Sequence, residues 1–213
     1  MDDWNLIQKI AIYALPVLFA ITVHEAAHGY AAKRLGDRTA EMMGRLSLNP
    51  LRHIDPIGTL LVPALALMLG GFLFGWAKPV PVDYRNLKNP KSDMLWVAAA
   101  GPASNFLMGL SWVFVLKLPS ALAGSIYQEP LFYMAQAGVQ INVALLVLNL
   151  LPLPPLDGGR ILVSLLPNRE ANFVAKIEPY GIFILLGLMA TGVLSGIMRP
   201  FLGAVFEFFS LFL

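Results

Sequence analysis

The sequence predicts an all-α polytopic membrane protein, folded as a bundle of helices. Of its 213 residues, 57% are hydrophobic and only 13% are charged, about half of the ~25% that is typical of soluble domains. The apolar residues gather in long stretches, and half of the charged residues lie in two connecting segments. A chain this apolar would expose more hydrophobic surface than water tolerates, so we expect a lipid bilayer to cover it.

Five apolar stretches and an aromatic tail follow one another along the chain. Most are near or above the ~20 residues that a membrane-spanning helix needs, and they lie at about 7–33, 57–75, 94–117, 131–166, 173–194 and 197–213. No polar segment is long enough for a typical soluble domain. We therefore expect one membrane-embedded domain over residues 1–213, with its core at about 7–167 and C-terminal helices at about 173–213. A net charge of +2 without a basic run argues against nucleic acid as a partner.

Two basic connecting segments, 33–55 and 78–93, flank the second apolar stretch. If residues 57–75 crossed the membrane once, the basic segments would lie on opposite faces, which the positive-inside rule disfavours. A re-entrant course, which Pro63 and Gly70-Gly71 would allow, places both segments on one side. An ordinary span with a proline kink is the alternative.

The residues His24-Glu25-Ala26-Ala27-His28 lie inside the first apolar stretch. On a helix, two histidines four residues apart project from one face, about 6 Å apart along the axis. Both imidazoles can then bind one zinc ion, while the glutamate holds a water against the metal and takes its proton. The pattern also arises by chance, but ionisable groups are rare in membrane segments and are usually functional there. A structural His–Glu network within a helix bundle is the alternative.

A catalytic zinc needs a third protein ligand, with the fourth position left for water. The fourth apolar stretch is broken at Pro152, Pro154 and Pro155, which cannot continue a helix, and Asp157 follows the break. A carboxylate in apolar surroundings is costly unless it meets a cation or a metal. Asp157 is therefore the predicted third ligand. The alternative is that it caps a helix or pairs with Arg160.

Together these motifs resemble the site-2 proteases, a family of intramembrane zinc metalloproteases. The resemblance covers most of the chain from about 20 to 167. It is carried by H-E-A-A-H at 24–28, G-R-L-S-L-N-P at 44–50, K-P-V-P-V at 78–82, G-P-A-S-N at 101–105 and N-L-L-P-L-P-P-L-D-G at 149–158. The second and third strings are similar to a short bacterial and archaeal type without a PDZ domain, in which the zinc motif lies on the first helix.

The resemblance implies a role for each matched residue. The ligands of one zinc ion would be His24, His28 and Asp157, and the catalytic base would be Glu25. Two asparagines would bind substrate, namely Asn149 and Asn105, and Asn149 would hydrogen-bond the substrate or the oxyanion.

In this family the two ligand-bearing helices run parallel, with one antiparallel span between them. Here two apolar stretches separate those helices, and full crossing of both would carry Asp157 to the wrong face. Because zinc–ligand bonds are about 2 Å long, we predict that 57–75 is re-entrant or that the loop before Asp157 folds back to mid-membrane. The family also has a β-hairpin between the first core helices, and short alternating strings in 44–82 predict a small one here. A polar connecting loop is the alternative.

The expected function is hydrolysis of a peptide bond in or near a substrate's transmembrane helix. The alternative is a non-catalytic membrane protein or a transporter that uses the metal site structurally. Expected partners are a transmembrane protein substrate, the bilayer and an adaptor that selects substrates. We expect an integral protein of the prokaryotic inner membrane, and the excess of Lys and Arg places the active site nearer the cytoplasmic face.

Overall fold

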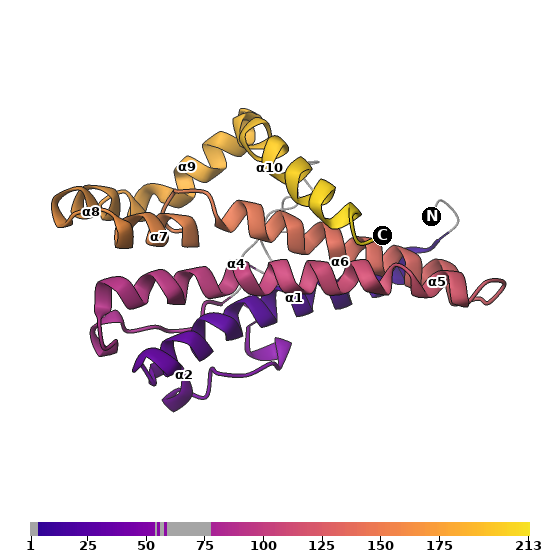
Figure 1. Cartoon of the computed structure of the whole chain (residues 1–213), viewed down its shortest axis with the longest axis horizontal. Helices are drawn as coiled ribbons and strands as arrows, with labels where there is room; N and C mark the ends of the chain where they lie inside the picture. The colour runs from indigo at the N-terminus through magenta and orange to yellow at the C-terminus, as the bar shows by residue number, and fades with distance from the viewer. Residues whose placement is uncertain (1–3, 54, 56–57, 59–77) are drawn as a thin grey trace.

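The computed structural model describes residues 4–53, 55, 58 and 78–213 (Figure 1). Every regular element assigned within them is a helix. The longer helices are α1 (Leu6–Leu35), α4 (Pro90–Val115), α6 (Gln128–Asn149), α7 (Asp157–Leu165), α8 (Asn168–Ala175), α9 (Glu178–Ala190) and α10 (Val193–Ser210). Short turns of helix join them, namely α2 (Thr39–Met42), η1 (Pro50–Arg52), η3 (Tyr84–Asn86) and α5 (Leu118–Ala121). The all-helical prediction is thus confirmed for this part of the chain.

The core consists of α1, α4 and α6, which pack against one another. The helices α1 and α6 run in the same direction, and α4 runs in the opposite direction (Figure 1). Among the described residues, these three and α10 are long and apolar enough to cross a membrane, while α8 and α9 form a further apolar pair bent by 61°. The chain is an integral membrane protein.

Local signals fix both ends of α1. The side chain of Asn5 accepts a hydrogen bond from the backbone N–H of Gln8, and the side chain of Gln8 accepts one from the N–H of Asn5, each at 2.9 Å. This reciprocal cap satisfies N–H groups that the first turn leaves unpaired. At the other end Gly36 has a φ of 119°, a left-handed conformation that glycine adopts without a steric penalty.

The end of α1 and the start of α4 lie at the same end of the bundle. Lys88 N donates to Leu35 O at 3.0 Å, and Lys78 N donates to His53 O at 2.9 Å. The chain between His53 and Lys78 therefore leaves from and returns to one place. Residues 57–75, for which a re-entrant course was predicted, fall almost entirely outside the described residues. Because α4 begins at the end of the bundle where α1 ends, α4 runs antiparallel to α1, and α6 can run parallel to α1.

The predicted β-hairpin in 44–82 is not found in the described residues of that region. Arg45 instead links the two described segments of this region, 44–53 and 78–82. Its Nη2 donates to Lys78 O at 3.1 Å and to Pro79 O at 3.4 Å. Pro79 and Pro81 have no backbone N–H, so one edge of this segment lacks two ladder donors, and on the other edge the N–H of Val80 is bound to Glu25 instead of to a strand. The described residues of this region form a connecting loop, which was the alternative.

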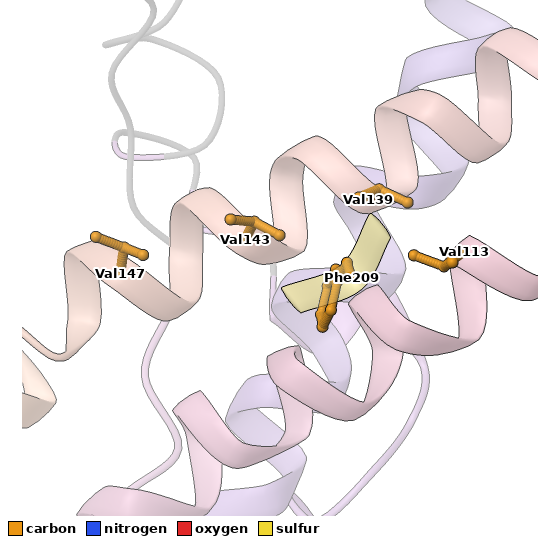
Figure 2. Close-up of a cluster of buried hydrophobic side chains, with 5 residues drawn as sticks. All are labelled: Val113, Val139, Val143, Val147 and Phe209. Carbon is orange, nitrogen blue, oxygen red and sulfur yellow. The ribbon is translucent and has the colours of Figure 1, made fainter. Parts of the chain in front are cut away.

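A hydrophobic cluster joins α10 to the core (Figure 2). Its buried members are Val113 of α4, Val139, Val143 and Val147 of α6, and Phe209 of α10. The ring of Phe209 is only 2% exposed. The aromatic tail therefore packs part of its length onto the bundle.

Asp37 ties the end of α1 to the segment before α4. Its buried carboxylate accepts hydrogen bonds from Thr39 N at 2.9 Å, Thr39 Oγ1 at 2.5 Å, Asp83 N at 2.8 Å and Asn86 Nδ2 at 3.2 Å. Burial raises the pKa of Asp37, but these hydrogen bonds outweigh it and lower the pKa below its usual value. The ionised carboxylate thus stabilises this junction.

Single-cysteine labelling tests the shared end of α1 and α4. The chain has no cysteine of its own, so each introduced thiol reports one site. We expect Met43→Cys and Lys88→Cys, both at exposed positions, to react with an impermeant maleimide from the same side of the membrane. Ile126→Cys is 81% exposed and lies in the segment that joins α5 to α6, which is at the opposite end of the bundle (Figure 1), and it should react from the other side. Labelling of positions 43 and 88 from opposite sides would contradict this arrangement.

Thermal unfolding of Asp37→Asn tests the junction. Because the folded-state pKa is lowered, Asp37 stabilises the fold above its unfolded-state pKa of about 4, and this contribution is lost as the pH falls through the folded-state value. We expect the substitution, which turns an acceptor into a donor, to lower the free energy of unfolding by about 1–3 kcal/mol at pH 7. The difference from the wild type should shrink below about pH 4. The exposed Glu129→Gln is the control, and an equal loss at pH 7 and pH 3 would count against this role.

Candidate metal centre

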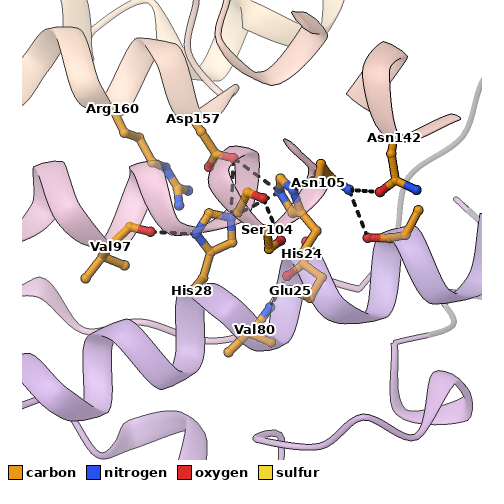
Figure 3. Close-up of polar contacts among 12 residues, drawn as sticks. His24, Glu25, His28, Val80, Val97, Ser104, Asn105, Asn142, Asp157 and Arg160 are labelled. Atoms are coloured by element: carbon orange, nitrogen blue, oxygen red, sulfur yellow. Dashed lines mark hydrogen bonds and ion pairs between the residues drawn. The ribbon is translucent and has the colours of Figure 1, made fainter. Parts of the chain in front are cut away.

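Three side chains from two distant parts of the chain converge between α1 and α7 (Figure 3). His24 Nε2 and His28 Nε2 lie 3.1 Å apart, and Asp157 Oδ2 lies 3.2 Å from the first and 3.3 Å from the second. His24 is 7% exposed and Asp157 is 6% exposed. Of the described residues, this is the group of histidine and acidic side chains whose geometry could hold a metal ion.

The sequence places these residues by simple local rules. His24 and His28 are one turn apart on α1 and therefore share a face. The chain leaves α6 at Asn149, makes a series of turns that include a cis Pro154-Pro155 peptide bond, and begins α7 at Asp157. Since α6 runs parallel to α1, this break brings Asp157 level with the histidines.

Gly101 allows α4 to lie close against the two imidazoles. A Cβ at this position would lie 2.5 Å from His28 Nε2 and 2.6 Å from His24 Cε1. These distances are far shorter than van der Waals contact, so any side chain here would push the imidazoles out of place.

Helix α4 also determines which nitrogen of His28 carries the proton. Its Nδ1 lies 2.7 Å from the backbone oxygen of Val97. A carbonyl only accepts hydrogen bonds, so Nδ1 carries a proton, and in the neutral ring Nε2 then keeps its lone pair. This is the arrangement that a metal-binding histidine needs.

His24 is held by a buried asparagine. Its Nδ1 lies 2.6 Å from Asn105 Oδ1, and Asn105 Nδ2 donates to Ala20 O at 3.2 Å and to Asn142 Oδ1 at 2.9 Å. With the amide oriented in this way, His24 also carries its proton on Nδ1. Both Nε2 atoms are then acceptors.

The convergent atoms fit a cation. When both imidazoles are neutral, two Nε2 lone pairs and a carboxylate oxygen face one another, and Asp157 Oδ2 is buried without a hydrogen-bond donor in the described structure. Such an arrangement is repulsive unless a positive charge lies among the three atoms. Two histidine nitrogens and one carboxylate oxygen are a donor set typical of catalytic zinc, with one position left open.

Glu25 is held beside the centre by a distant loop. Its Oε2 accepts a hydrogen bond from Val80 N at 2.7 Å, and the Arg45 guanidinium fixes the two residues before Val80 through their carbonyls. The carboxylate is only half-buried. It therefore combines a fixed orientation with access from outside.

Arg160 turns from α7 toward the centre (Figure 3), but it is bound to Tyr84 and Glu178 and not to the three convergent side chains. Its Nη1 donates to the Tyr84 hydroxyl at 3.0 Å, and its Nη2 lies 3.7 Å from Glu178 Oε1. The alternative considered from the sequence, a pair between Asp157 and Arg160, does not form. Asp157 meets the histidines instead.

The two asparagines predicted to bind substrate occupy different environments. Asn105 is completely buried, and both polar atoms of its amide already form hydrogen bonds within the helix bundle. It therefore offers no surface to a substrate. Asn149 is half-buried as the last residue of α6. Sequence reasoning missed Asn142, although a lone asparagine in an apolar helix was an available signal. It also missed the backbone groups of Val80 and Val97, which no residue type marks.

Comparisons with known proteins agree with this geometry. The model of peptidase family M50 matches residues 118–190, a range that contains Asp157. No solved structure shows a significant match.

Several curated relatives cover most of the chain. YwhC of Bacillus subtilis, provisionally named a zinc metalloprotease, is 38% identical over 193 residues, which are 89% of this chain and 85% of that protein. Rip2 of Mycolicibacterium smegmatis, also provisionally named a zinc metalloprotease, is 32% identical over 98% of this chain and 78% of its own. The regulator of sigma-E protease RseP of Salmonella typhimurium is 32% identical over 84% of this chain but only 40% of its own length. The chain belongs to peptidase family M50, the site-2 type of zinc metalloprotease.

Proposed function

We propose that this protein hydrolyses a peptide bond in or near the transmembrane helix of another protein. One zinc ion would be held by His24, His28 and Asp157, with Glu25 as the catalytic base. The observation that carries the proposal is the convergence of two imidazole nitrogens and a carboxylate oxygen, all able to bind a metal, at a buried point beside a half-buried carboxylate. A site that used a metal only structurally would need no such carboxylate.

Zinc, when bound, supplies a Lewis acid that polarises a carbonyl and makes a water molecule acidic. The chain provides the groups around it. Glu25 takes the proton of the attacking water and passes it to the leaving amine, and the N–H of Val80 keeps one of its oxygens in a fixed position. Asn149, at the end of α6 just before the turn to Asp157, hydrogen-bonds the substrate backbone or the oxyanion.

The substrate class follows from the surroundings of the site. The centre lies on a bundle of membrane-spanning helices, so the peptide that reaches it is itself in or near the membrane. A helical substrate hides its peptide bonds, and part of it must unwind before cleavage. One relative is named a regulator of sigma-E protease, and we propose a membrane-anchored protein as substrate here, selected by an adaptor.

The orientation rests on charge. Nine cationic residues lie in the connecting segments at the end of the bundle near the site, namely Lys33, Arg34, Arg38, Arg45, Arg52, Lys78, Arg85, Lys88 and Lys91. The positive-inside rule assigns this end to the cytoplasm. We therefore propose a prokaryotic inner-membrane protein with its centre nearer the cytoplasmic face, formed by a single domain over residues 1–213.

The variant Glu25→Gln tests the base. Gln keeps the shape of the side chain but cannot take a proton, so cleavage of a reporter transmembrane helix should fall by about 10²–10⁴-fold. Zinc content, measured by mass spectrometry on purified protein, should stay at about one ion per chain. The exposed Glu207→Gln on α10 should change neither value. Undiminished cleavage by Glu25→Gln would rule out this residue as the base.

The variant Gly101→Ala tests the convergence of the ligands. The added methyl group would overlap the His28 imidazole, so we expect zinc content and cleavage to be lost together. Gly196→Ala is the matched control, because a Cβ at position 196 of α10 meets nothing within 4 Å. Normal zinc binding by Gly101→Ala would mean that the imidazoles do not form the metal site in this geometry.

A further inference from the structure

We propose that Asn142 is a positioning residue, which acts through Asn105 to hold His24 in the tautomer that can bind a metal. The inference rests on the proposed function, because it takes His24 as a ligand. Asn142 lies on α6 and offers no ligand itself. Both asparagines are completely buried and lie in line with His24 (Figure 3).

We call the path of hydrogen bonds from Asn142 through Asn105 to His24 the relay. Two backbone carbonyls orient its amides. Asn142 Nδ2 donates to Gly138 O at 2.8 Å, and Asn105 Nδ2 donates to Ala20 O at 3.2 Å. Both carbonyls belong to helix backbones, and a carbonyl can only accept. The amide nitrogen of Asn142 therefore faces Gly138 O, while the longer contact with Ala20 O leaves the orientation of Asn105 to depend on Asn142 as well.

The orientation of one amide then determines the next. With its nitrogen on Gly138 O, Asn142 presents Oδ1 to Asn105, and Asn105 Nδ2 donates to it at 2.9 Å. Asn105 consequently presents Oδ1 to His24 Nδ1 at 2.6 Å. An oxygen in this position requires a proton on Nδ1, which leaves Nε2 unprotonated on the side of Asp157.

The opposite orientation would disable the ligand. If both amides were reversed, Asn105 Nδ2 would donate to His24 Nδ1, and the proton of the imidazole would move to Nε2. A protonated Nε2 has no lone pair for a metal. The reversed amides would also set oxygen against oxygen at Ala20 and Gly138, and the two carbonyls therefore act against it together.

His28 provides a comparison within the same site. Its Nδ1 contacts the Val97 carbonyl directly at 2.7 Å, so its tautomer depends on no side chain. His53 has the opposite tautomer, since its Nε2 lies 2.8 Å from Ser47 O. Only His24 depends on a chain of side-chain amides.

A purely structural role makes a different prediction. Asparagines between membrane helices also hold helices together by hydrogen bonds, and loss of that function would loosen α1, α4 and α6 as a unit. Both histidines would then be affected alike. Loss of the relay should instead change the tautomer of His24 alone.

The test uses the full chain in detergent micelles, labelled with ¹⁵N-histidine, free of metal and at a pH where the imidazoles are neutral. The chain has three histidines, so each ring can be assigned. In the wild type we expect Nδ1–H at His24 and His28 and Nε2–H at His53. In Asn142→Leu the His24 signals should move toward a mixture of tautomers, and in Asn105→Leu they should move further, while His28 and His53 stay unchanged.

Zinc affinity provides a second measurement, by competition with a chelator. Loss of a residue that orients a metal-binding histidine typically weakens metal binding about 10–100-fold. We expect a loss in that range for Asn105→Leu and a smaller one for Asn142→Leu. Val143→Ala is the matched control, since it removes buried volume from the next position of α6 without touching the relay. It should lower the Tm and leave both the tautomer and the affinity unchanged.

The outcomes separate the relay from the proposed function. If His24 keeps Nδ1–H in Asn142→Leu, or if His28 changes together with it, the relay is overturned. If the wild type shows the expected tautomers but binds no zinc, the proposed function fails and the relay stands. Should Asn142→Leu not fold, Asn142→Ser replaces it, because the shorter hydroxyl bonds back to Gly138 O and no longer reaches Asn105.

Discussion

Mutual repulsion among three acceptor atoms, present when both imidazoles are neutral and no metal is bound, is the constraint on which the rest of the structure depends. Two imidazole lone pairs and the Asp157 carboxylate face one another in a buried place, and only a cation makes that arrangement favourable. The packing of the helices must therefore offset the electrostatic repulsion among these three groups when no metal is bound. A metal bound among the three groups would make their interaction attractive, so metal binding is thermodynamically linked to the packing that holds Asp157, at the start of α7, against His24 and His28.

Helix α4 contributes no ligand, yet three of its residues lie directly against the two ligand histidines. Val97, Gly101 and Asn105 are spaced four residues apart, so they lie along one face of the helix. The first offers a carbonyl to His28, the second leaves room for both rings, and the third offers an amide oxygen to His24. The antiparallel span between the two ligand-bearing segments thus sets the protonation pattern of the site.

The parts of the centre that follow from local rules were readable in the sequence. The spacing of His24 and His28 follows from the helical period, and the prolines before Asp157 marked the break that places it. Contacts between distant segments were not readable, because no residue type identifies the Val80 N–H as the partner of Glu25 or Asn142 as the partner of Asn105. The hairpin prediction was wrong for the described residues, because it weighed alternation above the missing N–H groups of two prolines.

The hydrogen bond from Lys78 N to His53 O has a consequence for how this family can vary. It joins the two ends of the intervening stretch, so the chain on either side is fixed whatever lies between. Loop length costs little free energy once the ends are held together. We therefore expect insertions or exchanges between these two residues to leave the position of Glu25 unchanged, so that one arrangement of the centre can accommodate intervening stretches of different length.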